Sequence, residues 1–383
     1  MKDGAYAKGV NSVLPSMTYP SHTTIVTGVW PAKHGIYYNG MYEPNGSTGK
    51  IYWNDSSIKV PTLWSVARAK GLKTAALYWP VSADAPVDYN IPDIGSLGEE
   101  ARLKYSKPEG FVAEIKHNLF HDSTRIDHGH DHNIASIAAY IMKKDQPNLM
   151  AIHLFGLDHY SHEEGRDGPK VRAAVADADS SVGIIVRALK DAGIWDNTLF
   201  IVTGDHGFVT VTSSVNPNVW LAKEGLITDI KKDEWKAQFF SVGGSTFLYL
   251  KDPKDTKTLA QVKTILSQVP AEQKKFFRII DRAQLDKIGG NPEVALVLSG
   301  ENGAAFGNAT TGEAISSRKT GGSHGYFPDF KDIQTGFIAN GPGVKKGGVI
   351  NEMNVRDIAG VVARFLGLSM ATDGKEPVGL MAK

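Results

Sequence analysis

Short apolar runs alternate with longer amphipathic patterns along most of the chain. The apolar runs are typical of buried strands, which we expect at Lys73–Trp79, Asn148–Phe155, Thr198–Thr203 and Gly336–Ala339. The amphipathic patterns predict helices at Thr62–Lys70, Asn133–Lys144, Val171–Ala192 and Val355–Leu366. This alternation predicts an α/β fold, with a mostly parallel sheet that is covered by helices on both faces. In such sheets, ligands bind beyond the carboxyl ends of the strands.

The segment 208–323 has a different pattern. It combines strands expected at Gly244–Leu250 and Val294–Leu298 with a helix at Thr258–Gln268 and many turn signals. We therefore predict a smaller α+β insert at 208–323, within a core made of residues 1–207 and 324–383. Residues 84–132 are polar and have no strong period, so we expect them to form loops.

The composition narrows the chemistry that is open to the chain. Its 383 residues carry a net charge of +1, from 42 Lys and Arg against 41 Asp and Glu, so no nucleic-acid surface is expected. There is no cysteine, which excludes thiolate chemistry and leaves His and carboxylates as the ligands of any metal. No apolar run has the length of a transmembrane helix, and the start, Met-Lys-Asp-Gly-Ala-Tyr, lacks the apolar region of a signal peptide.

The stretch Pro15–Asn39 contains the first candidate for catalysis. Thr18 is followed by Tyr19 and by Pro20, which suits the first turn of a helix because it has a fixed φ and no N–H. Thr18 is then expected at or just before a helix N-terminus, where free amides and the helix dipole favour an anion. A hydroxyl in this place can attack a phosphorus or sulfur centre if a cation helps to deprotonate it. Taken alone, such a Thr is more often only an N-cap.

Three further places carry candidate metal ligands. Asp158 and His162 follow a predicted buried strand and are four residues apart, so a helical turn puts both on one side. Asp205 and His206 come directly after another predicted strand, where a buried charge and imidazole are costly unless they are paired or bind a metal. The alternative there is an ordinary Asp N-cap beside an uninvolved His. His324 lies between glycines where the chain returns from the insert to the core, and these oxygen and imidazole ligands together suit zinc.

The order of these motifs resembles that of one known family. A Thr at a helix start is followed by D-x-x-x-H, then D-H-G, then G-x-H-G, and the run Pro15–Asn39 contains T-Y-P-S-H, T-G and H-G-I-x-x-N. The chain closely resembles the type I phosphodiesterase/nucleotide pyrophosphatase family of the alkaline phosphatase superfamily, over nearly its whole length. The resemblance implies an alkaline-phosphatase-like core and an enzyme that hydrolyses phosphate diesters or nucleotide pyrophosphates. It also implies a small-molecule phosphate ester as the substrate and a periplasmic or secreted location.

The resemblance implies a role for each motif. Thr18 matches the nucleophile that becomes phosphorylated, and Asn39 matches the residue whose amide holds a non-bridging phosphoryl oxygen. Two cations then clamp the attacking and leaving oxygens of an in-line displacement, and water hydrolyses the phosphothreonine. Two zinc ions are implied. One has the ligands Asp158, His162 and His324, and the other has Asp205, His206 and the Thr18 hydroxyl.

One part of the family pattern is absent. The family's remaining zinc ligand is an Asp in an Asp-Gly pair at the end of the first strand, whereas only 17 residues precede Thr18 here. Asp3-Gly4 looks similar to this pair, but no apolar strand precedes it. We therefore expect that the N-terminal strand is missing from this sequence and that the Asp205/His206 metal is bound weakly. We also expect that the parent reading frame continues upstream into an apolar strand that ends in Asp-Gly.

Two other functions remain open. The first is a phosphomonoesterase or phosphonate hydrolase of the same superfamily, but such enzymes tend to carry a Lys-x-Arg or Lys-x-Lys clamp after the strand that here ends Tyr78-Trp79-Pro80. The second, of another class, is a non-catalytic metal-binding relative that lacks the first-strand Asp. A sulfatase is disfavoured, because sulfatases convert a Cys or Ser to formylglycine and the nucleophile position here is Thr.

Several other residues are interpreted as structural. The segment His117–His132 is rich in histidine, but no buried strand delivers it, and we expect a solvated polar loop. Trp79, next to Pro80, is expected to pack in the core. Tyr160 and Tyr326 flank predicted ligands and are expected either to line the substrate slot or to support the ligands.

Overall fold

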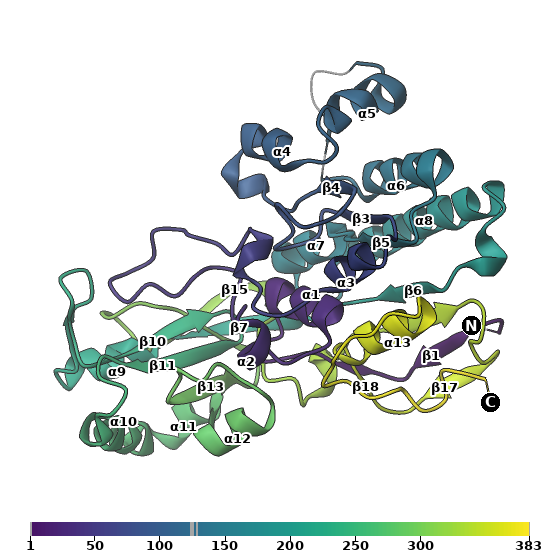
Figure 1. Cartoon of the computed structure of the whole chain (residues 1–383). Coiled ribbons are helices and arrows are strands. Elements are labelled where there is room, and N and C mark those ends of the chain that lie inside the picture. The colour runs from purple at the N-terminus through teal and green to yellow at the C-terminus, as the bar shows by residue number, and fades with distance from the viewer. Residues whose placement is uncertain (1, 123–125, 128, 383) are drawn as a thin grey trace.

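Two sheets form the centre of the molecule, which is represented by a computed structural model that describes residues 2–122, 126–127 and 129–382 (Figure 1). Sheet I has the strand order β17-β1-β16-β6, with the bounds β1 Ala5–Ala7, β6 Phe200–Thr203, β16 Phe337–Asn340 and β17 Gly348–Ile350. Sheet II has the order β4-β3-β5, with the bounds β3 Thr74–Leu77, β4 Tyr89–Ile91 and β5 Leu149–Ile152. The predicted core strands are therefore confirmed at β3, β5, β6 and β16.

The strand directions are mixed. All pairs in sheet II are parallel, and in sheet I β1 is parallel to β17. However, β16 runs antiparallel to both of its neighbours, β1 and β6. A short parallel pair, β2 Val10–Asn11 with β18 Met353–Asn354, lies beside sheet I.

Helices cover both faces of this strand system, as predicted. On one face lie α1 Thr18–Thr27, α3 Leu63–Ala69 and α13 Asp357–Phe365, and on the other lie α5 Phe111–Phe120, α6 Asp131–Asp145 and α8 Pro169–Asp191. The longest, α8, begins with Pro169 at its first position and buries Val171, Ala174, Ile185 and Leu189 along one stripe. This spacing puts its apolar side chains on the side that packs against α6.

Both apolar layers extend over the two sheets. Ala76 of β3 and Ile201 of β6 contribute to the layer under α1 and α13, and Leu77 of β3 and Phe200 of β6 contribute to the layer under α6 and α8. The two sheets are thus parts of one strand layer. Nevertheless, among the described residues β5 pairs only with β3, and β6 pairs only with β16. The side chains of β5 are half-buried while those of β3 are fully buried, and Val202 of β6 is 36% exposed.

The prediction of a loop-rich segment at 84–132 was wrong in part, because this segment also contains β4, α4 Glu99–Tyr105 and α5. The helix α4 buries none of its side chains, so its sequence has no amphipathic period. The histidines of the segment do behave as solvated groups: His117 pairs with Asp122, and His130 pairs with Asp127. One of them, His128, lies outside the described residues.

The segment 208–323 folds into further sheets and helices beside the core (Figure 1). An antiparallel sheet has the order β10-β11-β13-β12, and a second sheet has the order β14-β7-β15. The bounds are β7 Val209–Val215, α9 Pro217–Lys223, β8 Ile227–Asp229, β9 Glu234–Trp235, β10 Ala237–Val242, β11 Ser245–Leu250, α10 Thr256–Gln268, α11 Ala271–Lys274, β12 Phe277–Ile280, α12 Arg282–Lys287, β13 Leu296–Gly300, β14 Ala304–Phe306 and β15 Ile315–Ser323. In the described part of the chain, no helix combines the length and the apolar character needed to cross a membrane.

The open edges predict a difference in hydrogen exchange. Leu149 and His153 donate their N–H groups toward β3, so the alternating amides of Met150 and Ile152 point to the open edge of β5. We expect these two amides to exchange about tenfold or more faster than the amides of β3, which lies between two strands. Residue-resolved exchange by NMR measures this. Equal protection in β3 and β5 would show that another element pairs with the edge.

Candidate metal-binding active site

Thr18 lies at the start of α1 and faces the end of β6. It is the first residue of the helix, and the N-cap position is occupied by Met17, whose side chain makes no capping hydrogen bond. The Thr18 Oγ1 atom lies 3.4 Å from His206 Nε2. Asn39 lies close to this helix start, because its Oδ1 accepts a 2.9 Å hydrogen bond from the N–H of Tyr19. That bond uses the oxygen of the Asn39 carboxamide and leaves its NH₂ group as the donor.

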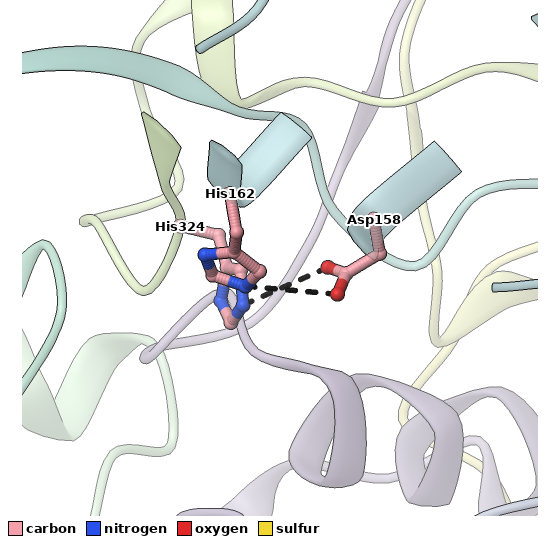
Figure 2. Close-up of side chains that lie close together, drawn as sticks. All are labelled: Asp158, His162 and His324. Carbon is pink, nitrogen blue, oxygen red and sulfur yellow. Dashed lines mark ion pairs between the residues drawn. The ribbon is translucent and has the colours of Figure 1, made fainter. Parts of the chain in front are cut away.

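The second group joins α7 to the end of β15 (Figure 2). Asp158 and His162 share one side of α7 Gly156–Glu164, with His162 Nε2 3.6 Å from Asp158 Oδ2. His324 follows β15 directly, and its Nε2 lies 3.8 Å from Asp158 Oδ1. One ligand atom from each of these three residues lies within 4.8 Å of the others. The three residues predicted to hold one metal are therefore brought together.

The third group lies at the carboxyl end of β6. Asp205 and His206 follow the strand in a turn before β7 rather than at a helix start, so Asp205 is not an N-cap. The Asp205 Oδ2 atom is 3.2 Å from His206 Nε2. In turn, His206 Nδ1–H donates to the carbonyl of Gly207 at 3.1 Å, which leaves Nε2 as the atom that can bind a metal.

The second and third groups lie side by side and form one site. His206 Nε2 is 3.9 Å from Asp158 Oδ1, and the rings of His206 and His324 are stacked with their centroids 4.0 Å apart. The glycine after His324 closes the site against α1, because Gly325 N–H donates to Ser16 O. Only glycine fits there, since φ is +89° and a Cβ atom would lie 2.4 Å from the carbonyl oxygen of Val242. Segments that are far apart in the sequence thus meet around Thr18.

The residues fit a metal ion. Asp158 Oδ1 and Asp205 Oδ2 are both buried without a hydrogen-bond partner, which is costly for a carboxylate oxygen unless a cation satisfies it. Each oxygen faces the Nε2 atom of at least one imidazole. A set of carboxylates and imidazoles with no sulfur is suited to zinc and similar divalent ions.

Burial and neighbouring charges shift the pKa values of three site residues in different directions. Burial raises the pKa of Asp158, although the rings of His206 and His162 oppose this effect. Burial lowers the pKa of His324 well below its usual value. For Asp205, burial would raise the pKa, but His206 and His22 outweigh it and hold the pKa well below the usual range.

Sequence reasoning missed three residues that surround Asp205. His22 Nδ1 lies 3.4 Å from Asp205 Oδ2, and the ring of His153 lies 4.3 Å from the ring of His22. Ser12 donates a 2.6 Å hydrogen bond to the carbonyl of Asp205. His22 belongs to the T-Y-P-S-H motif, which is the signal that could have found it. The contacts of Ser12 and His153 depend on tertiary structure.

The other aromatic predictions have clear positions. Trp79 is buried in the layer under α1 and α13, which agrees with packing in the core. Tyr326 is almost fully buried, and its hydroxyl donates to Ala304 O, so it supports the loop of His324 rather than lining a substrate slot. Tyr160 is half-buried on α7.

Comparison with known proteins agrees with the fold and identifies the family. Residues 1–327 match the family described as type I phosphodiesterase/nucleotide pyrophosphatase. The murine ectonucleotide pyrophosphatase/phosphodiesterase 5 structure superposes with a TM-score of 0.70 at 22% identity, covering 98% of this chain and 90% of the murine chain. Rat ectonucleotide pyrophosphatase/phosphodiesterase family member 3 is 23% identical over 96% of this chain and 39% of its own length. Human family member 5 is 26% identical over 54% of this chain and 39% of its own length.

The fold and the grouped Asp and His side chains define an α/β protein with a candidate metal site beside a Thr at a helix start. The chain belongs to the type I phosphodiesterase/nucleotide pyrophosphatase family. It spans about two fifths of the length of the rat and human relatives.

Removal of one ligand is expected to remove one metal. We expect His324→Ala to lose about one zinc equivalent, because a site of three protein ligands that loses one imidazole no longer competes with solvent. Elemental analysis after gel filtration in zinc-free buffer measures this. His159→Ala is the matched control, because His159 is an exposed histidine of the same helix as His162 and pairs with Glu163. Equal metal content in both variants would contradict the assignment.

Metal binding at Asp158 is expected to weaken as the pH falls. Because burial raises the pKa of Asp158, its folded carboxyl group holds a proton at a higher pH than an exposed Asp, and a metal must displace that proton. The zinc affinity should therefore rise with pH through this raised pKa and fall below it. Competition titrations with a chelator between about pH 5 and 8 follow the change, since His and carboxylate ligands must be deprotonated to bind. An affinity that does not change with pH would contradict a role of Asp158 as ligand.

Proposed function

We propose that this protein hydrolyses phosphate diesters or nucleotide pyrophosphates, with Thr18 as the nucleophile and two zinc ions as cofactors. The observation that carries the proposal is the position of the Thr18 hydroxyl at the N-terminus of α1, 3.4 Å from His206. A second murine family member 5 structure, with a TM-score of 0.70 to this chain, is of an inactive threonine-to-alanine variant in complex with AMP. That relative supports a nucleotide as one class of substrate and a threonine as the essential residue.

The proposed metal sites divide the donors into two sets. Asp158, His162 and His324 would hold one ion, and Asp205, His206 and the Thr18 hydroxyl would hold the other. When bound, the ions would supply Lewis-acid stabilisation of the charge on the attacking and leaving oxygens. The imidazoles of His162 and His206 are aimed by their Nδ1–H bonds to the carbonyls of Gly322 and Gly207.

The residues of the chain itself supply the nucleophile and the groups that bind the phosphate. The Thr18 hydroxyl gives its proton to water as its oxygen attacks phosphorus, and the P–O bond to the ester oxygen breaks on the opposite side, where this oxygen takes up a proton from water. A second water then attacks phosphorus and breaks the bond to the Thr18 oxygen, which releases the phosphate product and restores the Thr18 hydroxyl. Asn39 is fixed by Tyr19 N–H and presents its NH₂ group to a phosphoryl oxygen. The N-terminal end of α1 adds the positive end of a helix dipole next to the phosphate.

The Asp205 site is proposed to lack one carboxylate in this chain. Asp3, the first residue to consider as a replacement, is exposed at the start of β1, and its carbonyl accepts from Asn340. A strand placed between β5 and β6 would lie beside Asp205, because both neighbouring strands end at the site.

The nucleophile assignment predicts a selective loss. Thr18→Ala should reduce the hydrolysis of bis-p-nitrophenyl phosphate by about 10³-fold or more, because the other hydroxyls of the first turn are engaged elsewhere, that of Tyr19 with Asp93 and that of Ser21 with Ser12. Metal content should remain nearly unchanged, and Thr18→Ser should recover part of the activity. Thr23→Ala is the control on the same helix, because the Thr23 hydroxyl has no hydrogen-bond partner. Near-wild-type turnover in Thr18→Ala would sink the assignment.

The same assay separates the alternative functions. A phosphomonoesterase would hydrolyse p-nitrophenyl phosphate faster than the diester, and a non-catalytic relative would hydrolyse neither with zinc present. Chelation should abolish the diesterase activity, and zinc should restore it.

The incomplete Asp205 site predicts unequal zinc binding. Loss of an outer-shell partner already costs about 10–100-fold in affinity, so loss of a direct ligand should cost more. We expect the 383-residue chain to bind one zinc tightly and one weakly. Two tight zincs in the 383-residue chain would show that another residue replaces the missing carboxylate.

A further inference from the structure

His22 links the proposed nucleophile to the proposed metal ligand Asp205. It lies one helical turn after Thr18 on α1 and is only 4% exposed. Its Nδ1 is 2.8 Å from the carbonyl oxygen of Thr18 and 3.4 Å from Asp205 Oδ2. The proposed reaction uses Thr18 and Asp205, but it gives no role to this ring.

The hydrogen-bond chemistry fixes the tautomer of His22. A carbonyl oxygen only accepts, so Nδ1 of His22 carries the proton. The same N–H faces the second acceptor, Asp205 Oδ2, which is buried and has no hydrogen-bond partner. The Nδ1–H group of His22 therefore lies between the carbonyl oxygen of Thr18 and the carboxylate of Asp205.

The ring of His22 is held in place from its other sides. The indole of Trp79 meets it edge-on with centroids 4.6 Å apart, and the ring of His153 lies at 4.3 Å. His153 is itself fixed by a 3.1 Å bond from Nδ1–H to the carbonyl of Tyr78. Burial lowers the pKa of His153 to about 3, so this neighbour is uncharged at neutral pH. Such packing keeps His22 in one orientation.

A second connection runs parallel to the first. The hydroxyl of Ser21, the residue before His22, lies 2.8 Å from Ser12 Oγ, which donates to the carbonyl of Asp205 at 2.6 Å. The start of α1 and the Asp205 turn are therefore joined both through the carboxylate and through the backbone. These contacts set the position of Asp205 relative to Thr18.

We propose that His22 is a positioning residue, whose Nδ1–H holds the Thr18 carbonyl and the Asp205 carboxylate at a fixed separation. The inference rests on the proposed function, because it assigns His22 to the same site. His22 acts through its neighbours rather than as a ligand. A ring nitrogen that donates its N–H to the Thr18 carbonyl has no lone pair to offer a metal ion.

Two amide substitutions separate positioning from packing. In His22→Asn, the side-chain nitrogen can occupy the place of Nδ1 and keep the donor, whereas in His22→Gln the amide extends toward the place of Nε2. We expect His22→Gln to lower kcat by about 10–100-fold with little change in KM, because the ring is buried and acts on the reaction only through its neighbours. His22→Asn should recover most of this loss. Equal losses in both variants would mean that the ring only fills space.

The zinc affinity provides a readout that does not depend on turnover. In chelator-competition titrations, His22→Gln should weaken the weaker of the two zinc affinities by about 10–100-fold and leave the tighter one unchanged. His34→Gln is the matched control, because His34 is also fully buried and contacts α1 through Thr24, but it lies outside the site. All variants are compared at a temperature where their circular dichroism shows the folded state. The same loss of affinity in His34→Gln would overturn the proposal.

The wild-type protein supplies a test that needs no variant. Long-range ¹H–¹⁵N NMR of the histidine side chains should show His22 protonated at Nδ1, and the Nε2–H tautomer would overturn the proposal. If the wild-type protein hydrolyses no diester but its zinc affinity responds to His22→Gln as expected, the proposed function fails and the role of His22 stands. If the protein is an active diesterase whose kcat and zinc affinity are unchanged in His22→Gln, the inference about His22 is wrong while the proposed function stands.

Discussion

The structure depends on the burial of two carboxylates in one cluster of imidazoles. Asp158 and Asp205 each keep an oxygen atom buried without a hydrogen-bond partner, and the rings of His206 and His324 stack between them. In water such groups would be solvated, so folding around them is costly unless a cation occupies the cluster. Metal binding is therefore expected to contribute to the stability of the fold as well as to the chemistry.

The open edges of β5 and β6 make the expected contribution of metal binding to the stability of the fold larger. β5 leads into α7 with Asp158, and β6 leads into the turn with Asp205, yet no hydrogen bonds join these two strands in the described residues. Side chains of the shared apolar layers and the contact between Asp158 and His206 hold them together instead. An ion between the two ends would act where strand pairing is lacking, and this couples metal binding to the closure of the sheet.

The sequence predicts most of the site but less of its surroundings. The apolar runs locate β3, β5, β6 and β16, and the helical start at Thr18 follows from Pro20. The antiparallel direction of β16 could not be predicted, because a local pattern does not encode the pairing partner. The helix α4 was missed because it buries no side chain and therefore has no period. The role proposed for His22 depends on its contact with Asp205, which is 183 positions further along the chain. The local motif that contains His22 therefore gives no physical reason to expect this role.

The two donor sets also differ in how they depend on the fold. Asp158 and His162 lie one turn apart on α7, so local helix geometry already fixes two members of this group of three residues, and only His324 must come from a distant segment. Asp205 and His206 are adjacent in a turn, where successive side chains point in different directions, and they need outside support to converge on one ion. That support comes from α1, through Thr18, His22 and the Ser21–Ser12 pair. The helix that presents the proposed nucleophile therefore also shapes the proposed metal site beside it, so a displacement of α1 would disturb both together.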